Sequence, residues 1–168
     1  MSVRTEPRFT RDADLAVAVD DDAAAERLIR ALRARGYVVD SLVEQTAVAR
    51  IATVRLRRTG VAPVPVIDLL FASSGIEHEV VDQAEPVEVL PGLRLAVAST
   101  AHLIALKLLS RDDEQRPQDL VDLRSLLKNA SSADLEQAKL AAGLIMARGY
   151  NRDRDLANEL RRIGGGGP

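Results

Sequence analysis

The sequence contains no cysteine, and its 168 residues include only two histidines, His78 and His102. The absence of cysteine excludes disulfide bridges and thiolate metal sites, and two histidines argue against a histidine-rich zinc site. Oxygen ligands remain, and these favour Mg²⁺ or Mn²⁺. Any metal site in this protein is therefore expected to be built from carboxylates.

Aromatic residues are also scarce, with two phenylalanines, two tyrosines and no tryptophan. These rings are too few for a platform that stacks several bases. The formal net charge of −2 argues against a uniformly basic nucleic-acid-binding protein, although positive charge can still be concentrated locally. No apolar run approaches the roughly 18 residues of a membrane span, and no signal-peptide core follows Met1. The sequence thus predicts a cytoplasmic protein without a membrane segment.

Hydrophobic residues make up 46% of the chain and charged residues 29%, which is typical of a globular protein. Before residue 99, alternating and β-branched segments predict strands and one amphipathic segment predicts a helix. The expected strands cover 10–19, 37–39, 47–58, 64–72, 87–90 and 93–98, and the expected helix covers 23–35. From residue 99 the apolar spacing becomes helical, with helices expected at 100–110, at 117–129, between a Ser132 cap and Gly149, and at 152–162. This pattern predicts an α+β fold with an αβ domain over 1–98, a helical domain over 99–163 and a flexible tail over 164–168.

Asp12 and Asp14 are separated by one residue in a segment that is expected to be a strand. Alternate residues of a strand project from the same face, about 7 Å apart, so the two carboxylates could share divalent cations. The alternative is that both acids lie on the solvent face of an edge strand.

Asp68 interrupts an otherwise apolar strand segment, residues 66–71. A charge in a buried strand needs a partner or a metal. Either Asp68 lies at an exposed strand end, satisfied by backbone donors or an arginine, or it joins Asp12 and Asp14. Three carboxylates on neighbouring strands would suit the metal site of phosphoryl or nucleotidyl transfer.

Lys107 is one of only three lysines and lies in the most apolar helical segment of the chain. Its ammonium either reaches the surface or is directed at an anion such as phosphate. On the following helix, the phase of the leucines places Asp119 at the edge of the buried face and Asp122 further toward solvent. Asp119 is therefore the better candidate for an inward role, with helix N-terminal charge complementarity as the alternative.

Arginines gather before the Asp pair and along one expected strand. They could hold a polyanion, although a solvated arginine-rich face is the favoured interpretation for most of them. They are Arg4, Arg8 and Arg11, and Arg50, Arg55, Arg57 and Arg58.

In their order along the chain, these motifs resemble the AbiEii-type nucleotidyltransferase toxins, including the mycobacterial MenT group, within the DNA polymerase β-like nucleotidyltransferase superfamily. The resemblance extends over about residues 7–160, and the joint order of the motifs is more specific than any one of them. The matching stretches are residues 7–15, 67–70, 102–108, 116–123 and 148–150.

The resemblance implies a polymerase-β-like palm followed by a helical domain. It also implies a toxin that transfers nucleotides from an NTP, with a pyrimidine such as CTP favoured in some members, to the 3′ end of tRNA, which would block aminoacylation. A cognate antitoxin is the implied protein partner.

The same resemblance assigns roles residue by residue. Asp12 and Asp14 would bind Mg²⁺ or Mn²⁺, with Asp68 as a third metal ligand by superfamily geometry. Lys107 would contact the triphosphate, and Asp119 would be the acid of the later motif. The remaining matches, expected to bind substrate, are Thr10, Arg11 and Arg116.

One family feature is missing, because the family places a Gly-Gly or Gly-Ser turn before the Asp pair and no such pair occurs among residues 1–11. The backbone amides of this turn help to hold the triphosphate. Two alternatives therefore stay open beside transfer to tRNA. One is nucleotidyl transfer to a small molecule, and the other is a catalytically impaired short form that binds an antitoxin.

Overall fold

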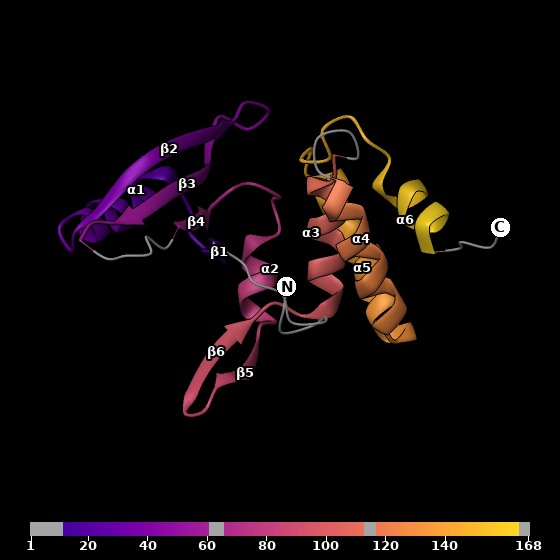
Figure 1. The fold of residues 1–168 in the computed structure, drawn as a ribbon. Coiled ribbons are helices and arrows are strands. Elements are labelled where there is room, and N and C mark those ends of the chain that lie inside the picture. The colour runs from indigo at the N-terminus through magenta and orange to yellow at the C-terminus, as the bar shows by residue number, and fades with distance from the viewer. Residues whose placement is uncertain (1–11, 61–65, 113–116, 165–168) are drawn as a thin grey trace. The chain divides into compact units, whose positions relative to one another are not determined.

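The computed structural model describes residues 12–60, 66–112 and 117–164 (Figure 1). The chain forms two compact units that divide between Val81 and Asp82. We call the first the sheet unit and the second the helical unit, and describe each by itself. The sequence pattern places residues 1–98 together, whereas in the structure residues 82–98 group with the helices that follow them.

The sheet unit contains a mixed four-stranded sheet with the strand order β1-β4-β3-β2. Strand β1 pairs in parallel with β4, and the other two pairings are antiparallel. The antiparallel pair that the sequence predicts across Gly60 is confirmed, and regular pairing of its second strand begins at Val66. The strands are β1 (Asp12–Ala16), β2 (Tyr37–Gln45), β3 (Arg50–Arg58) and β4 (Val66–Leu70).

Helix α1 (Asp22–Arg33) packs its apolar stripe against one face of this sheet. Asp21 caps the helix, because its side chain accepts a 2.7 Å hydrogen bond from the backbone N–H of Ala24. Gly36, at φ 86°, supplies the left-handed residue that turns the chain into β2. The buried residues of this core are Ala25, Ile51, Val54, Leu56, Leu69 and Phe71.

A short helix that the sequence analysis missed, α2 (Glu77–Asp82), follows β4. The Glu77 carboxylate is buried and accepts hydrogen bonds of 2.7 to 2.9 Å from the backbone N–H and hydroxyl groups of Ser73 and Ser74. These contacts hold the turn that leads into the helix. Its apolar pattern is too short to be recognised as helical from spacing alone.

The helical unit begins with a hairpin of β5 (Glu85–Leu90) and β6 (Leu93–Val97), joined through Gly92 at φ 77°. The strands expected at 87–90 and 93–98 therefore form an antiparallel pair across Pro91 and Gly92. The helices that follow are α3 (Thr100–Ser110), α4 (Pro117–Asn129), α5 (Ser132–Ala147) and α6 (Leu156–Gly164).

Helix α3 covers the expected residues, with Ser99 as its cap, but two other expectations are wrong. Ser131, not Ser132, caps α5, and it forms a reciprocal capping box with Asp134. The last helix begins four residues after the predicted start at 152, because Arg152 and Asp153 have φ values of 54° and 58° that a helix cannot contain.

Apolar side chains of all four helices form the core of the helical unit, and the largest fully buried ones are Ile104, Leu108, Leu123, Leu126, Ile145 and Leu156. Arg154 stabilises the edge of this core. Its guanidinium donates to the carbonyl oxygens of Leu109 at 3.0 Å and Arg111 at 3.4 Å, and it also pairs with Glu159. Within the described ranges, none of the helices is long and apolar enough to cross a membrane.

Candidate active site

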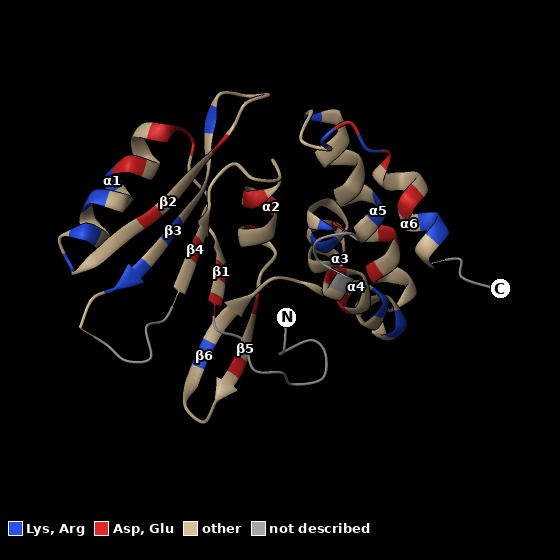
Figure 2. Ribbon diagram, turned by 45° about the horizontal axis from the view of Figure 1, so that its top comes forward, with Lys and Arg blue, Asp and Glu red and all other residues tan. Residues whose placement is uncertain are grey.

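The sheet of the first unit has one face packed on α1 and an opposite face that carries the charged residues. Asp14, Asp68 and Arg55 are in register across β1, β4 and β3, so their side chains form one row on that second face. Asp12, two residues before Asp14 on the same strand, shares the face. We call it the acid face and define it by Asp12, Asp14, Asp68 and Arg55. Figure 2 shows acidic (red) bands on β1 and β4 and basic (blue) bands on β3.

Both acids of the predicted pair lie on β1 and are exposed. Among the strands that the structure describes, β1 lies at the edge of the sheet and pairs with β4 alone. The register places Asp14 directly beside Asp68 on the neighbouring strand, where in-register residues of adjacent strands lie about 5 Å apart. The proximity of Asp14 and Asp68 is thus a property of the fold, although more than fifty residues separate them in the sequence.

Asp68 lies inside β4, and only 10% of its side chain is exposed. Arg55 on β3 provides its partner: Nε donates to Oδ1 at 2.8 Å and Nη2 donates to Oδ2 at 2.6 Å. This two-pronged contact satisfies the buried charge. It also raises the pKa of Arg55 above its ordinary value, chiefly through the hydrogen bonds and charge of Asp68 and less through the charges of Asp12 and Asp14.

The acid face fits a divalent cation in its donor chemistry, because its three acids offer only the carboxylate oxygens that Mg²⁺ and Mn²⁺ prefer. Among the described residues, no group of three or more His, Cys, Asp or Glu side chains is arranged to hold a metal ion. At Asp68, Arg55 donates a hydrogen bond to each of the two carboxylate oxygens. Asp12 and Asp14 would hold a cation first, and Asp68 would add to them.

Lys107 and Asp119 come together in the helical unit. The Lys107 ammonium on α3 donates to Oδ1 of Asp119 on α4 at 2.6 Å, and lies 3.2 Å from Oδ2 of Asp122. The expected inward position of Asp119 is confirmed, because the residue is 3% exposed. The expected solvent position of Asp122 is wrong, since it is 7% exposed and shares the same lysine. Lys107 therefore has carboxylate partners on the next helix, an arrangement that spacing along α3 did not indicate.

His102 is 5% exposed, and its Nδ1 lies 3.0 Å from the Ser99 hydroxyl that caps α3. His102 is therefore a packing residue at the start of the helix.

The arginines of β3 are largely matched by carboxylates of the same unit. Arg50 donates to Asp22 at 2.8 Å, and Arg57 pairs with Asp40. The hydrogen bond from Arg57 lowers the pKa of Asp40, and the charges of Arg57 and Arg55 add to the effect. Arg58 lies over the ring of Tyr37, 5.9 Å from its centroid. This strand is consequently a row of ion pairs rather than an uncompensated strip of positive charge.

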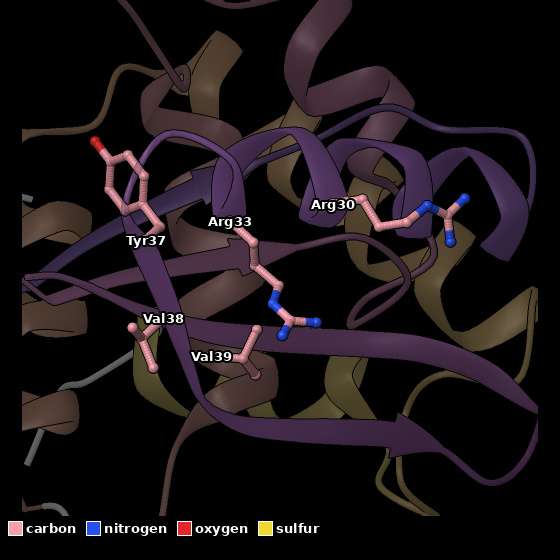
Figure 3. A pocket seen from close by; sticks show the side chains of 5 residues that line it. All are labelled: Arg30, Arg33, Tyr37, Val38 and Val39. Carbon is pink, nitrogen blue, oxygen red and sulfur yellow. The ribbon is translucent and has the colours of Figure 1, made fainter.

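The sheet unit also has an open pocket of about 630 Å³ between the end of α1 and the start of β2 (Figure 3). Arg30 and Arg33 line it from the helix, and Tyr37, Val38 and Val39 line it from the strand. Arg30 also donates to Glu26 at 3.1 Å, and Figure 3 shows its guanidinium and the Tyr37 ring pointing away from each other. The three acids belong to other strands and are not part of this pocket.

The remaining predicted substrate-binding residues, Thr10, Arg11 and Arg116, lie outside the described residues. The sequence analysis missed the pairing of Arg55 with Asp68. The sequence suggested an arginine as one possible partner of Asp68. It could not identify Arg55, because that choice depends on the register between β3 and β4.

The sequence model of the nucleotidyl transferase AbiEii toxin family, of the type IV toxin–antitoxin systems, matches residues 1–164. The chain belongs to the AbiEii family. Membership makes it a nucleotidyltransferase of a toxin–antitoxin system, a class that uses an NTP and a divalent metal, and it implies an antitoxin partner. The fold class is α+β, as the sequence predicted.

Two solved structures from Helicobacter pylori resemble this AbiEii-family chain. One is described as a nucleotidyltransferase, with 16% identity, a TM-score of 0.38, and coverage of 94% of this chain and 76% of the other. The second is JHP933, with 17% identity, a TM-score of 0.36, and coverage of 94% and 74%. No curated protein matches the sequence significantly.

Proposed function

We propose that this AbiEii-family chain transfers nucleotides from an NTP, preferably a pyrimidine such as CTP, to the 3′ end of tRNA in a reaction that requires Mg²⁺ or Mn²⁺. The observation that carries the proposal is the register that sets Asp14 beside Asp68 on a face shared with Asp12. Action on tRNA would place the protein in the cytoplasm and would make it toxic by blocking aminoacylation.

In this proposal Asp12 and Asp14 bind the divalent cation, and Asp68 is the third acid. When bound, such a cation neutralises triphosphate charge and favours ionisation of the attacking hydroxyl. The contribution of the chain is to fix the acids on a sheet whose other face is anchored by an apolar core. Two of them lie on β1 and are exposed.

Lys107 is the proposed triphosphate contact, with Asp119 as the acid that orients it. The 2.6 Å hydrogen bond fixes the direction of the ammonium. The Lys107 side chain is only 16% exposed, so little water reaches the charge. A positioned charge in such surroundings stabilises an anion more than a mobile surface lysine does. Thr10, Arg11 and Arg116 are proposed to bind substrate, as the family motifs imply.

The acceptor RNA needs cationic contacts outside the acid face, and the pocket lined by Arg30 and Arg33 offers them. A small-molecule acceptor is the second candidate. The observation that favours it is the pairing of Arg50, Arg55 and Arg57 with carboxylates, which leaves little net positive charge along β3.

Incubation of the purified chain with Mg²⁺, total tRNA and each labelled NTP in turn, followed by a denaturing gel, tests the proposal. We expect label on tRNA with one pyrimidine NTP preferred. The Asp14→Asn variant should lose at least about a hundredfold in rate, because a carboxylate that binds the cation is removed. Asp20→Asn, an exposed aspartate outside the acid face, is the matched control and should keep wild-type activity.

Each other outcome points elsewhere. No transfer to tRNA by the folded protein would contradict the proposal and would favour either the small-molecule acceptor or the non-catalytic, antitoxin-binding interpretation. Label that appears on a small product once a metabolite extract is added would favour the small-molecule acceptor.

A further inference from the structure

The Arg55–Asp68 ion pair joins an exposed group to a buried one. The side chain of Arg55 is 47% exposed, whereas that of Asp68 is 10% exposed. The two hydrogen bonds use one nitrogen for each carboxylate oxygen, at 2.8 and 2.6 Å. Asp68 therefore has its charge compensated by a group that can leave toward solvent without disturbing the core.

A cation bound at Asp12 and Asp14 would have to share Asp68 with this guanidinium. The row Asp14, Asp68, Arg55 runs across three neighbouring strands, so Asp68 stands between the predicted cation ligands and the arginine. A guanidinium and a divalent cation repel one another, and both seek the same two oxygens. Binding of one at Asp68 thus weakens binding of the other.

We infer that Arg55 is a competing internal cation: it holds Asp68 in the metal-free protein, and Asp68 becomes a metal ligand only when Arg55 releases it. The inference rests on the proposed function, because it takes the metal site at Asp12 and Asp14 as given. It assigns Arg55 a positioning role that lowers metal affinity in the resting protein and keeps the buried acid compensated until the cation arrives.

Titration of the purified full-length chain with Mn²⁺, with free Mn²⁺ followed by electron paramagnetic resonance and no nucleotide present, measures this competition directly. The decisive variant is Arg55→Lys, which keeps the positive charge but cannot form the two-pronged contact. We expect it to bind Mn²⁺ about threefold more tightly than wild type, and Arg55→Gln about tenfold more tightly.

Arg57→Gln is the matched control, because Arg57 lies on the same strand and face, also pairs with an aspartate, and loses the same charge. It should change Mn²⁺ affinity by less than about twofold, as expected for an exposed pair. In an Asp68→Asn background, the effect of Arg55→Gln should shrink to that of Arg57→Gln.

The inference is overturned if Arg55→Lys leaves Mn²⁺ affinity unchanged, or if Arg55→Gln and Arg57→Gln tighten binding equally. Asp14→Asn separates these results from failure of the proposed function. Mn²⁺ binding that Asp14→Asn abolishes and Arg55→Lys does not alter contradicts the inference alone. Absence of Mn²⁺ binding in wild type and every folded variant contradicts both. Circular dichroism establishes the fold of each variant, and Arg55→Lys alone suffices if Arg55→Gln does not fold.

Discussion

The ammonium of Lys107 and the carboxylate of Asp119 form a 2.6 Å hydrogen bond that joins α3 to α4. Asp122, one turn further along α4, approaches the same ammonium at 3.2 Å. The lysine is surrounded by apolar residues of α3, yet its charge is compensated by the neighbouring helix. The residue proposed to meet the triphosphate is therefore also part of the packing between two helices.

Replacing Lys107 with Met should destabilise the helical unit. Removal of the lysine leaves two buried carboxylates without their shared cation, which costs about 3 kcal/mol in the free energy of unfolding. Chemical denaturation measures this change. Lys139→Met is the control, since Lys139 pairs with Glu136 on the surface and its loss should cost less than about 1 kcal/mol. Equal effects of the two substitutions would show that the Lys107 pair contributes no more than a surface pair.

That stability effect governs how activity is tested. A Lys107 variant that is inactive because it unfolds says nothing about the triphosphate. The informative measurement is therefore NTP affinity of Lys107→Met at a temperature where circular dichroism shows it folded. We expect at least about a tenfold loss of NTP affinity there, and unchanged affinity would remove Lys107 from its proposed role.

Features that depend on adjacent residues were predictable from the sequence. Ser99 marks the start of α3, Pro117 stands in the first turn of α4, and Gly36 ends the turn after α1. Each acts through a local preference: a capping hydroxyl, a fixed φ, or freedom to adopt a positive φ. The presence of Asp12 and Asp14 on one strand was predictable for the same reason.

Features that depend on distant partners were not. The sequence predicts a strand of residues 37–39, but pairing with β3 extends β2 to Gln45. Helical phase alone sends Asp122 toward solvent, whereas the Lys107 ammonium compensates its charge and allows its burial. The sequence predicts that the charge of Asp68 needs a partner, but the partner, Arg55, follows from the register between β3 and β4.

Arg154→Leu should lower the free energy of unfolding more than replacement of an ordinary surface arginine does. The Arg154 guanidinium satisfies the carbonyl oxygens of Leu109 and Arg111 and pairs with Glu159. Loss of these contacts should lower the free energy of unfolding by about 2 kcal/mol, because two carbonyl oxygens lose this donor and Glu159 keeps only its 3.5 Å ion pair with Arg111. Arg161→Leu on the exposed side of α6 is the control and should stay within about 0.5 kcal/mol of wild type in the same denaturation experiment.

The Asp40 carboxyl should titrate below its ordinary pKa of 3.8. The unfolded chain then takes up the proton first as the pH falls, so the contribution of the pair to stability is complete above the unfolded pKa and is lost as the pH falls through the folded pKa. Carboxyl-carbon NMR measures the titration. Arg57→Gln should raise the pKa of Asp40 toward 3.8, while Arg50→Gln, which affects Asp22 instead, should leave it unchanged.

Metal removal should separate activity from stability. The sheet unit has an apolar core, and Arg55 compensates the charge of Asp68. We therefore expect the sheet unit to fold without a metal ion. A chelator should abolish nucleotide transfer and lower the melting temperature by no more than about 4 °C. Restoring Mg²⁺ should restore transfer. Cooperative unfolding on chelation at room temperature would show that the cation is structural.

The parallel pairing of β1 with β4 has a consequence for synthesis of the chain. β1 is made before the other described strands, yet β4, the partner that the structure describes for it, ends at Leu70. A nascent chain released before that point carries Asp12 and Asp14 but cannot place Asp68 beside them. Such long-range pairing must wait for the intervening hairpin and helix. The toxin's acids are thus assembled late, and a fragment that stops short of β4 lacks the acid face altogether.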